Sequence, residues 1–221
     1  MMLIAELGSS PAPEWDLRRW CETAADAGAD AVKIQLFWAE HFPLAEQASK
    51  RPLEFPRERL AEFVETAHSL GLQAGASVFD ADAVELAARH CDWLKLAARE
   101  QNNTDLELKA FYTLRPVYRS ISRREPIFKS MRQTTLWTVE RYPTPLWIAI
   151  WHAWRAAAFL NSQAVGWGWS SHTCYGLDCF LAARLGASVV EKHLALAPDN
   201  IESGHSLLPA HFKRLAAALH R

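Results

Sequence analysis

The sequence lacks the features that point to a membrane, to secretion or to nucleic acid. It contains no run of about eighteen apolar residues, and no charged segment precedes an apolar one at its start, because "LIAELG" reaches Glu6 within a few residues. Lys and Arg number 24 against 25 Asp and Glu, so there is no basic excess to hold a phosphate backbone. These absences predict a soluble, cytoplasmic protein with neither nucleic acid nor membrane as a partner.

Cysteine is also scarce and carries no recognisable motif. The four cysteines form no CxxC pair, and the spacing of Cys174 and Cys179 is not one that metal sites use. We therefore interpret them as reduced thiols, most of them with a packing role.

Short apolar runs alternate with helical patterns along the whole chain. Eight runs are candidate strands, namely "LIAEL", "AVKIQLF", "QAGASVF", "WLKLAA", "PVYRSI", "TLWTV", "VGWGWSS" and "SVVEKHL". Amphipathic stretches between and after them predict helices over 16–27, 57–70, 81–89, 146–160, 176–185 and 209–220. This order predicts an α/β fold of the (β/α)₈ TIM-barrel type, as a compact single catalytic domain over residues 1–221.

An open doubly wound sheet is the alternative fold. The barrel is favoured because no GxGxxG motif follows the first strand. In addition, polar residues stand at the ends of nearly all the strands, whereas an open sheet would gather them at a single switch point. The fourth and fifth helices are the least regular part of the predicted barrel. The stretch for the fourth, residues 105–114, is short, and the stretch for the fifth, residues 123–133, contains Pro126.

The last strand, within "GASVVEKHLAL", ends in three ionisable residues. Alternation along a strand places Glu191 and His193 on one face and Lys192 on the other. Buried charges of this kind cost several kcal/mol unless they are paired, bind a metal or lie at the mouth of a pocket. We therefore expect Glu191 and His193 to face a pocket and Lys192 to face the helix layer.

Barrel active sites form at the carboxyl ends of the strands, and the polar residues there make a coherent set. Lysines supply point charges for a phosphate or carboxylate, serine hydroxyls add neutral donors, and two histidines on adjacent strands can hold a divalent metal. The candidates are Glu6, Lys33, Gln35, Ser77, Asp80, Lys95, Glu100, Ser120, Ser170, His172, Glu191 and His193.

Structural roles are the alternative for several of these residues. His193 alone suits hydrogen-bonded packing, and Lys33 suits a salt bridge to Glu6 or Glu191. A tryptophan stripe at helical spacing favours a packing or subunit face over a ligand platform. It consists of Trp147, Trp151 and Trp154, and the remaining histidines, His205 among them, are interpreted as surface or capping groups.

Five motifs in order together resemble the sialic acid (N-acetylneuraminate) synthase family. They are "IAELG", "AGADAVKIQLF", "YPTP", "GWSSHTCYG" and "LGASVVEKHLAL…SLLP", and they span the barrel from Ile4 to Pro209. The resemblance implies a (β/α)₈ barrel that condenses phosphoenolpyruvate with an open-chain N-acetylhexosamine-like amino sugar and releases phosphate. It also implies a divalent metal, Mn²⁺ or Mg²⁺, as cofactor, and a nonulosonate-type sugar acid as product.

The same resemblance assigns roles residue by residue. Lys33 and Lys95 correspond to the lysines that grip phosphoenolpyruvate, and Ser120 and Ser170 to hydroxyl donors to the same ligand. The implied metal ligands are His172 and His193, the acid–base or water-orienting carboxylates are Glu6 and Glu191, and the sugar-side contacts are Asn102 and Tyr142.

Several positions depart from the family pattern. Val78 stands where a phosphate-binding threonine is expected, Ala98 replaces a serine donor, and "WTVERYPTP" alters the sugar side. Two lost donors cost about 1–3 kcal/mol each in a phosphate site, for which Arg99 or Arg119 would compensate. Glu202 is the nearest match to the acidic residue expected before "SLLP".

The family's small antifreeze-like domain has no counterpart after the eighth predicted helix. We expect it to be absent or separately encoded, and any homodimer to use barrel surfaces. Two other functions stay open beside the synthase, namely an aldol-type barrel enzyme acting on another carbonyl substrate and a non-catalytic binding or scaffold paralogue.

Overall fold

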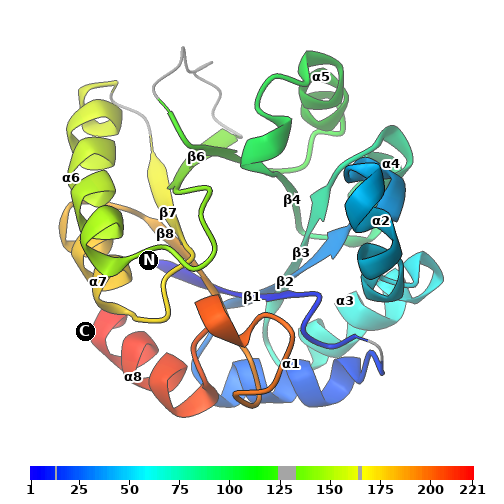
Figure 1. Cartoon of the computed structure of the whole chain (residues 1–221), viewed down its shortest axis with the longest axis horizontal. Coiled ribbons are helices and arrows are strands. Elements are labelled where there is room, and N and C mark those ends of the chain that lie inside the picture. The colour runs from blue at the N-terminus through cyan, green and yellow to red at the C-terminus, as the bar shows by residue number, and fades with distance from the viewer. Residues whose placement is uncertain (13, 124–132, 164–165) are drawn as a thin grey trace.

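Eight parallel strands, hydrogen-bonded in chain order from β1 to β8, close into a barrel that helices surround (Figure 1). The computed structural model describes residues 1–12, 14–123, 133–163 and 166–221. The strands are β1 Met2–Gly8, β2 Ala31–Leu36, β3 Gln73–Val78, β4 Trp93–Leu96, β5 Val117–Ile121, β6 Gln133–Thr138, β7 Trp167–Ser171 and β8 Val189–His193. The predicted TIM barrel is thereby confirmed.

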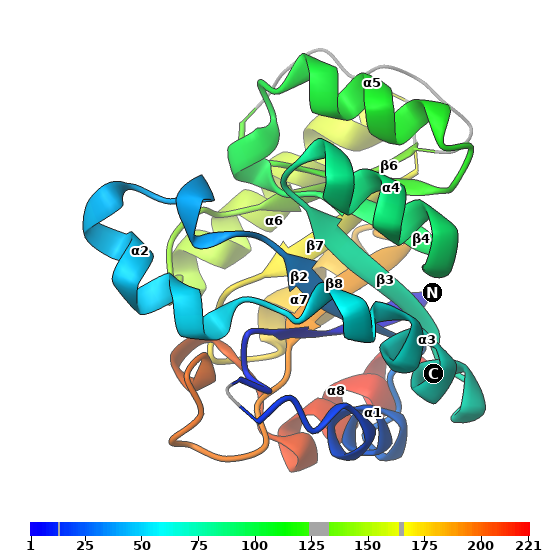
Figure 2. The same cartoon turned by 90° about the vertical axis from the view of Figure 1, so that its right-hand side faces the viewer.

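The helices follow the strands in the expected order, with one addition. They are α1 Leu17–Asp26, α2 Leu44–Lys50, α3 Leu60–Ser69, α4 Ala81–His90, α5 Thr104–Tyr112, α6 Leu146–Ser162, α7 Leu177–Arg184 and α8 Pro209–Leu219. Helix α2 was not predicted, and the helix expected over 123–133 lies almost wholly outside the described residues. Figure 2 shows α2 and the segment after β8 at the end of the barrel opposite the N-terminus.

Side-chain caps set where three of the helices begin. Asp16 accepts a hydrogen bond from Arg19 N before α1, Asp80 accepts one from Ala83 N before α4, and Asn103 accepts one from Leu106 N before α5. Each cap satisfies a backbone N–H that the first helical turn leaves without a partner. The strand-to-helix turns at the mouth of the barrel are therefore fixed locally.

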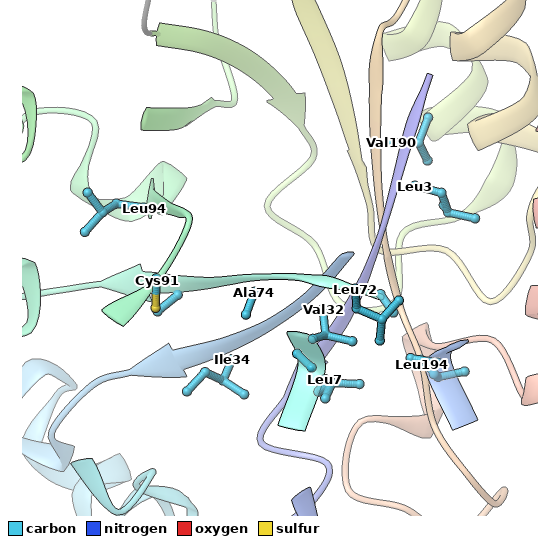
Figure 3. Close-up of a cluster of buried hydrophobic side chains, with 14 of the residues drawn as sticks. Leu3, Leu7, Val32, Ile34, Leu72, Ala74, Cys91, Leu94, Val190 and Leu194 are labelled. Carbon is cyan, nitrogen blue, oxygen red and sulfur yellow. The ribbon is translucent and has the colours of Figure 1, made fainter. Parts of the chain in front are cut away.

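The main hydrophobic core lies between the barrel wall and the helices. Its strand residues are alternate ones, such as Leu3 of β1, Val32 of β2, Ala74 of β3, Leu94 of β4 and Val190 of β8, all of them completely buried. Figure 3 draws part of this cluster. Because the wall is buried on both faces, the strands read as apolar runs with few polar interruptions.

A smaller apolar cluster fills the inside of the barrel near the amino ends of the strands. It consists of Ile4, Ala31, Trp93, Tyr118, Leu136 and Val189. A Cβ on Gly75 would lie 2.4 Å from the Trp93 ring, so only glycine leaves room for the indole. This floor closes the barrel below the polar residues at its mouth.

The surface of α6 carries the tryptophan stripe. Trp147, Trp151 and Trp154 are 73%, 54% and 57% exposed, so the stripe does not pack into the core. Its role as a subunit face stays a prediction. Within the described ranges, no helix has the length and hydrophobicity that crossing a membrane requires.

All four cysteines are free thiols. Cys21, Cys91 and Cys179 are buried as predicted, and burial raises the pKa of Cys21 and Cys91 to about 12. Cys174 is exposed and does not share that packing role.

Candidate active site

Two residues above the apolar floor, the inward position of each strand becomes polar. Strand register sets Glu6 opposite both Lys33 and His193, Ser77 opposite Lys95, and Ser170 opposite Glu191. The ring is made of Glu6, Lys33, Ser77, Lys95, Ser120, Thr138, Ser170 and Glu191, all of them buried. Every strand thus contributes one polar side chain to the same volume, as barrel active sites require.

An ion-pair network links the lysines and carboxylates of this ring. Lys33 forms a salt bridge with Glu6, donates to Ser77 Oγ at 2.7 Å, and has its Nζ 3.6 Å from Glu191 Oε2. Lys95 pairs with Glu191 Oε1, which also accepts a hydrogen bond from Ser170 Oγ at 2.7 Å. The salt bridges weighed as a structural role for Lys33 are therefore present, inside the predicted site.

Burial and neighbouring charges change how these groups titrate. Burial lowers the pKa of Lys33 to about 7, although Glu191 acts in the opposite direction. Burial opposes ionisation of Glu191, but Lys33 and Lys95 outweigh it and hold the pKa of that carboxyl below its usual range. Glu191 is therefore a carboxylate at neutral pH, and Lys33 titrates far more easily than an exposed lysine.

Two buried polar atoms of the ring make no hydrogen bond within the described part of the chain. They are Ser120 Oγ and Glu191 Oε2. A buried hydroxyl or carboxylate oxygen without a partner is costly, and such atoms recur where a ligand or water supplies the missing bond. A donor and an acceptor are thus available at the mouth.

Two predicted metal ligands, His172 and His193, meet above the ring. His172 lies just after β7 and His193 ends β8, and their ring centroids are 5.5 Å apart. His172 Nδ1 lies 2.9 Å from Val139 O, which fixes that ring. Burial, reinforced for His172 by His193 and for His193 by Lys192, lowers the pKa of both well below 6.5. Both imidazoles are therefore neutral and carry a lone pair.

Glu202 joins the site from the segment after β8. Its Oε2 lies 2.9 Å from His193 Nδ1, and its Oε1 accepts a hydrogen bond from Ser9 N at 3.1 Å. A Cβ on Gly8 would lie 2.1 Å from Glu202 Oε2. Glycine at the end of β1, with φ +55°, thus leaves the space that the carboxylate occupies.

His205 was not predicted as a site residue, and its interpretation as a surface or capping group is wrong. It lies in a 3₁₀ turn, Ser203–His205, with its ring 4.5 Å from that of His193 and 5.2 Å from that of Tyr142. The only signal in the sequence is its place between Glu202 and "SLLP", which says nothing about how the turn folds back.

Tyr142 and Asn102, the predicted sugar-side residues, have different surroundings. The Tyr142 ring lies 4.0 Å from that of His172 and is still 57% exposed, so it borders the site. Beside it opens a cavity of about 590 Å³ lined by Tyr142, Pro143, Thr144, Leu146, Cys174 and Tyr175. Asn102 is exposed and accepts a hydrogen bond from Arg123 at 3.0 Å, and no contact among the described residues joins it to the polar ring.

Residues at the departures from the family pattern face other directions. Val78 packs in the outer core, so it is Ser77 that faces the mouth at that point. Arg119 pairs with Glu107 of α5 at 3.0 Å, and Arg99 stacks on Phe42 with 4.5 Å to the ring centroid. Compensation by Arg119 is therefore not supported by its position.

Lys192 faces the helix layer, as the alternation predicted. It is completely buried, bonds to Thr173 O, and donates to His205 O at 3.0 Å and Ser171 Oγ at 3.4 Å. Asp178 of α7 accepts from Thr173 Oγ1 at 2.9 Å and from Trp169 Nε1 at 2.8 Å. This outer network ties β7, α7 and the turn that carries His205 together.

Comparison with a family model decides where the chain belongs. The model of the NeuB family matches residues 20–123 and 129–221. The chain belongs to the NeuB family. This confirms the resemblance to the sialic acid synthase family. None of the curated protein sequences matches the chain.

Solved structures of several other proteins share the fold. The N-acetylneuraminic acid (sialic acid) synthetase from Leptospira borgpetersenii serovar Hardjo-bovis, in complex with citrate, is 22% identical with a TM-score of 0.87, over 100% of this chain and 82% of that one. The putative spore coat polysaccharide biosynthesis protein E from Chromobacterium violaceum is 21% identical with a TM-score of 0.84, over 100% and 74%. A truncated 3-deoxy-D-arabino-heptulosonate 7-phosphate synthase from Thermotoga maritima is 14% identical with a TM-score of 0.74, over 100% and 85%.

Proposed function

We propose that this NeuB-family chain condenses phosphoenolpyruvate with the open-chain aldehyde of an N-acetylhexosamine-like amino sugar. The product is a nonulosonate-type sugar acid, and phosphate is released. The observation that carries the proposal is the buried polar ring above the apolar floor. Two lysines, two carboxylates and a hydroxyl without a hydrogen-bond partner among the described residues surround one volume there.

Phosphoenolpyruvate is the ligand that the lysine side of the ring suits. Lys33 and Lys95 supply two positive charges within the ring, and Ser120 Oγ has a hydrogen bond to offer. In a buried site such charge-assisted bonds are stronger than in water. Ser170 acts through Glu191, because its hydroxyl is already committed to that carboxylate.

The sugar is expected on the side of the mouth where Tyr142 lies. The cavity beside Tyr142 has room for a chain of several carbons, and its lining mixes aromatic and polar residues. Asn102 is exposed and bonded to Arg123, so a sugar contact at Asn102 requires its segment to move toward the site.

The donor set at the histidine side fits a divalent metal. His172 and His193 are neutral imidazoles 5.5 Å apart, and Glu202 adds a carboxylate against His193. We propose that His172 and His193 hold Mn²⁺ or Mg²⁺, and such an ion would supply Lewis-acid polarisation of the aldehyde oxygen.

The chain's own residues account for the remaining steps. The reaction joins C3 of phosphoenolpyruvate to the aldehyde carbon, and water then adds to C2 before the C–O bond to phosphate breaks. Glu191 Oε2 has no hydrogen-bond donor in the described structure, so it is placed to accept one from that water and take its proton. Lys33 and Lys95 hold the phosphate and carboxylate charges throughout, and Glu6 keeps Lys33 in position.

Phosphate release tests this proposal directly. Purified protein is incubated with phosphoenolpyruvate, Mn²⁺ and a panel of N-acetylated hexosamines, beside the variants Lys95→Ala and His193→Ala. Sugar-dependent release that both substitutions abolish supports the proposal. Lys109→Ala is the matched control, because Lys109 is a surface lysine paired with Glu85. Release that survives Lys95→Ala contradicts the assignment.

An aldol-type reaction is the second candidate, favoured by one observation. The pKa of Lys33 is lowered to about 7 by burial, and lysines of that kind form Schiff bases with carbonyl substrates. Borohydride reduction in the presence of pyruvate distinguishes the two reactions, since only the Schiff base becomes a stable adduct at Lys33. No adduct is expected from the synthase.

A further inference from the structure

Three side chains at the histidine side of the mouth form a cluster that the paired histidines do not explain. His193, Glu202 and His205 each offer one ligand atom, and these atoms lie within 4.8 Å of one another. Ligand atoms that share one divalent ion lie roughly 3–3.5 Å apart when each is about 2.0–2.2 Å from it. A small inward movement of the turn that carries His205 therefore closes the cluster around an ion.

The carboxylate of the cluster is positioned from both ends of the chain. Ser9 N donates to Glu202 Oε1, and Glu202 Oε2 lies 2.9 Å from His193 Nδ1. Gly8 leaves the space for both oxygens, since an added Cβ would lie 2.1 Å and 2.6 Å from them. These contacts therefore orient the Glu202 carboxylate toward His193. A cation bound between the two side chains would take the position of the proton that they share.

The imidazole of His205 is also held toward the cluster. Lys192 donates to His205 O, and Leu207 N donates to His193 O at 2.9 Å, so the segment after β8 folds back on the strand end. The His205 ring centroid lies 4.5 Å from that of His193, and imidazole nitrogens are common ligands of divalent transition metals.

Charge in the mouth favours a cation at this place. Glu6, Glu191 and Glu202 bring three carboxylates against the two lysines Lys33 and Lys95. A divalent ion beside Glu202 would add positive charge to these groups, which suits a site proposed to hold an anionic substrate.

We propose that Glu202 and His205 are further ligands of the divalent metal that His172 and His193 are proposed to hold. The proposal deepens the metal site of the proposed function and rests on His193 binding an ion. A donor set with several imidazoles selects Mn²⁺, Fe²⁺ or Co²⁺ over Mg²⁺, which prefers an all-oxygen shell with bound waters.

Metal binding, measured without substrate, tests this site. The full chain is titrated with Co²⁺ by calorimetry and by visible absorbance, beside His205→Gln and Glu202→Gln. We expect His205→Gln and Glu202→Gln each to weaken Co²⁺ binding at least tenfold and to change the visible spectrum. We also expect the wild type to prefer Co²⁺ over Mg²⁺ by at least about a hundredfold, and His205→Gln to narrow that preference.

Controls separate ligand loss from unfolding and from failure of the proposed function. His211→Gln removes an exposed imidazole six residues away and is expected to bind Co²⁺ like the wild type. Thermal melting of each metal-free variant shows whether it is folded. Co²⁺ affinity and spectrum unchanged in folded His205→Gln overturn the proposal, whatever the phosphate assay gives. Loss of Co²⁺ binding in both Gln variants supports the proposed metal ligands. A failure of every sugar to elicit phosphate release would refute only the proposed reaction.

Discussion

The inside of the barrel mouth and the layer outside its wall both hold buried charges, but the hydrogen bonding of those charges differs between the two regions. Inside, Lys33 and Glu191 are paired, yet Glu191 Oε2 and Ser120 Oγ have no hydrogen bond in the described structure. Outside, one residue further along β8, Lys192 bonds to three oxygens, and Asp178 accepts two hydrogen bonds. Incomplete pairing marks the region built for a ligand, and complete pairing marks the region built for stability.

The largest effect is expected inside. Glu191→Gln keeps an oxygen to accept from Lys95 and Ser170 but loses the charge and the base, so we expect kcat/KM for sugar-dependent phosphate release to fall by at least about 10³. Initial rates measure this, and circular dichroism confirms the fold. The surface substitution Glu62→Gln is the control. Activity within tenfold of the wild type would remove Glu191 from the chemistry.

Outside, the same kind of change acts on stability. Lys192→Met leaves the carbonyls of Thr173 and His205 buried without their donor. We expect a loss of about 3 kcal/mol in the free energy of unfolding, or roughly 6–12 °C in Tm, with phosphoenolpyruvate affinity nearly unchanged. Urea denaturation and calorimetry measure the two quantities. Lys213→Met, at an exposed lysine of α8, is the control, and a Tm shift below about 2 °C contradicts the structural role.

Gly8→Ala tests the boundary between the two regions. The added Cβ would meet Glu202, so we expect a loss of about 1–3 kcal/mol in stability and a weaker Co²⁺ affinity. Gly71→Ala is the matched control, because Gly71 also has a positive φ, +77°, and an added Cβ there meets nothing within 4 Å. If both variants bind Co²⁺ equally well, the clash with Glu202 has no bearing on the metal.

Ser120→Ala sharpens the difference between unpaired and paired hydroxyls. Because Ser120 Oγ has no partner in the described residues, we expect stability to be unchanged or slightly higher, and phosphoenolpyruvate affinity to fall about five- to tenfold. Ser170→Ala, which removes the donor to Glu191, should instead lower stability by about 1 kcal/mol. Isothermal titration and urea denaturation report both. Unchanged affinity in Ser120→Ala would exclude the hydroxyl from the ligand site.

The smallest effect is a pH dependence of binding. Burial lowers the pKa of Lys33 to about 7, so its ammonium is present below that pH and is lost as the pH rises through it. The affinity for phosphoenolpyruvate should therefore fall gradually from pH 6 to pH 9. The same shift makes protonated Lys33 unfavourable for folding, so its contribution to stability improves over that range. A flat binding profile across these pH values would show that Lys33 stays charged.

Strand alternation was enough to predict the inward row of the site. Each inward polar residue follows an inward apolar residue by two positions on the same strand, as is the case for Glu6, Lys33, Lys95 and Glu191. Parallel register brings such residues together in any closed barrel. The same rule placed Lys192 outside. It also explains why Val78 packs in the outer core while Ser77 faces the mouth, since residues one step apart face opposite sides of the wall.

Residues on the loops were beyond that rule. His205 and Glu202 reach the site because the segment after β8 folds back through a Leu194–Leu207 bridge and the bond from Lys192, and no periodicity encodes such a return. Asn102, assigned from the motif, lies on an exposed turn after β4. Loop conformation depends on tertiary contacts that a single sequence does not display.

The hydrogen bond from Ser9 to Glu202 spans 193 positions of the chain. Contacts of such long range form only when β8 has closed the barrel against β1, so the cluster around His193 is among the last parts of the molecule to assemble.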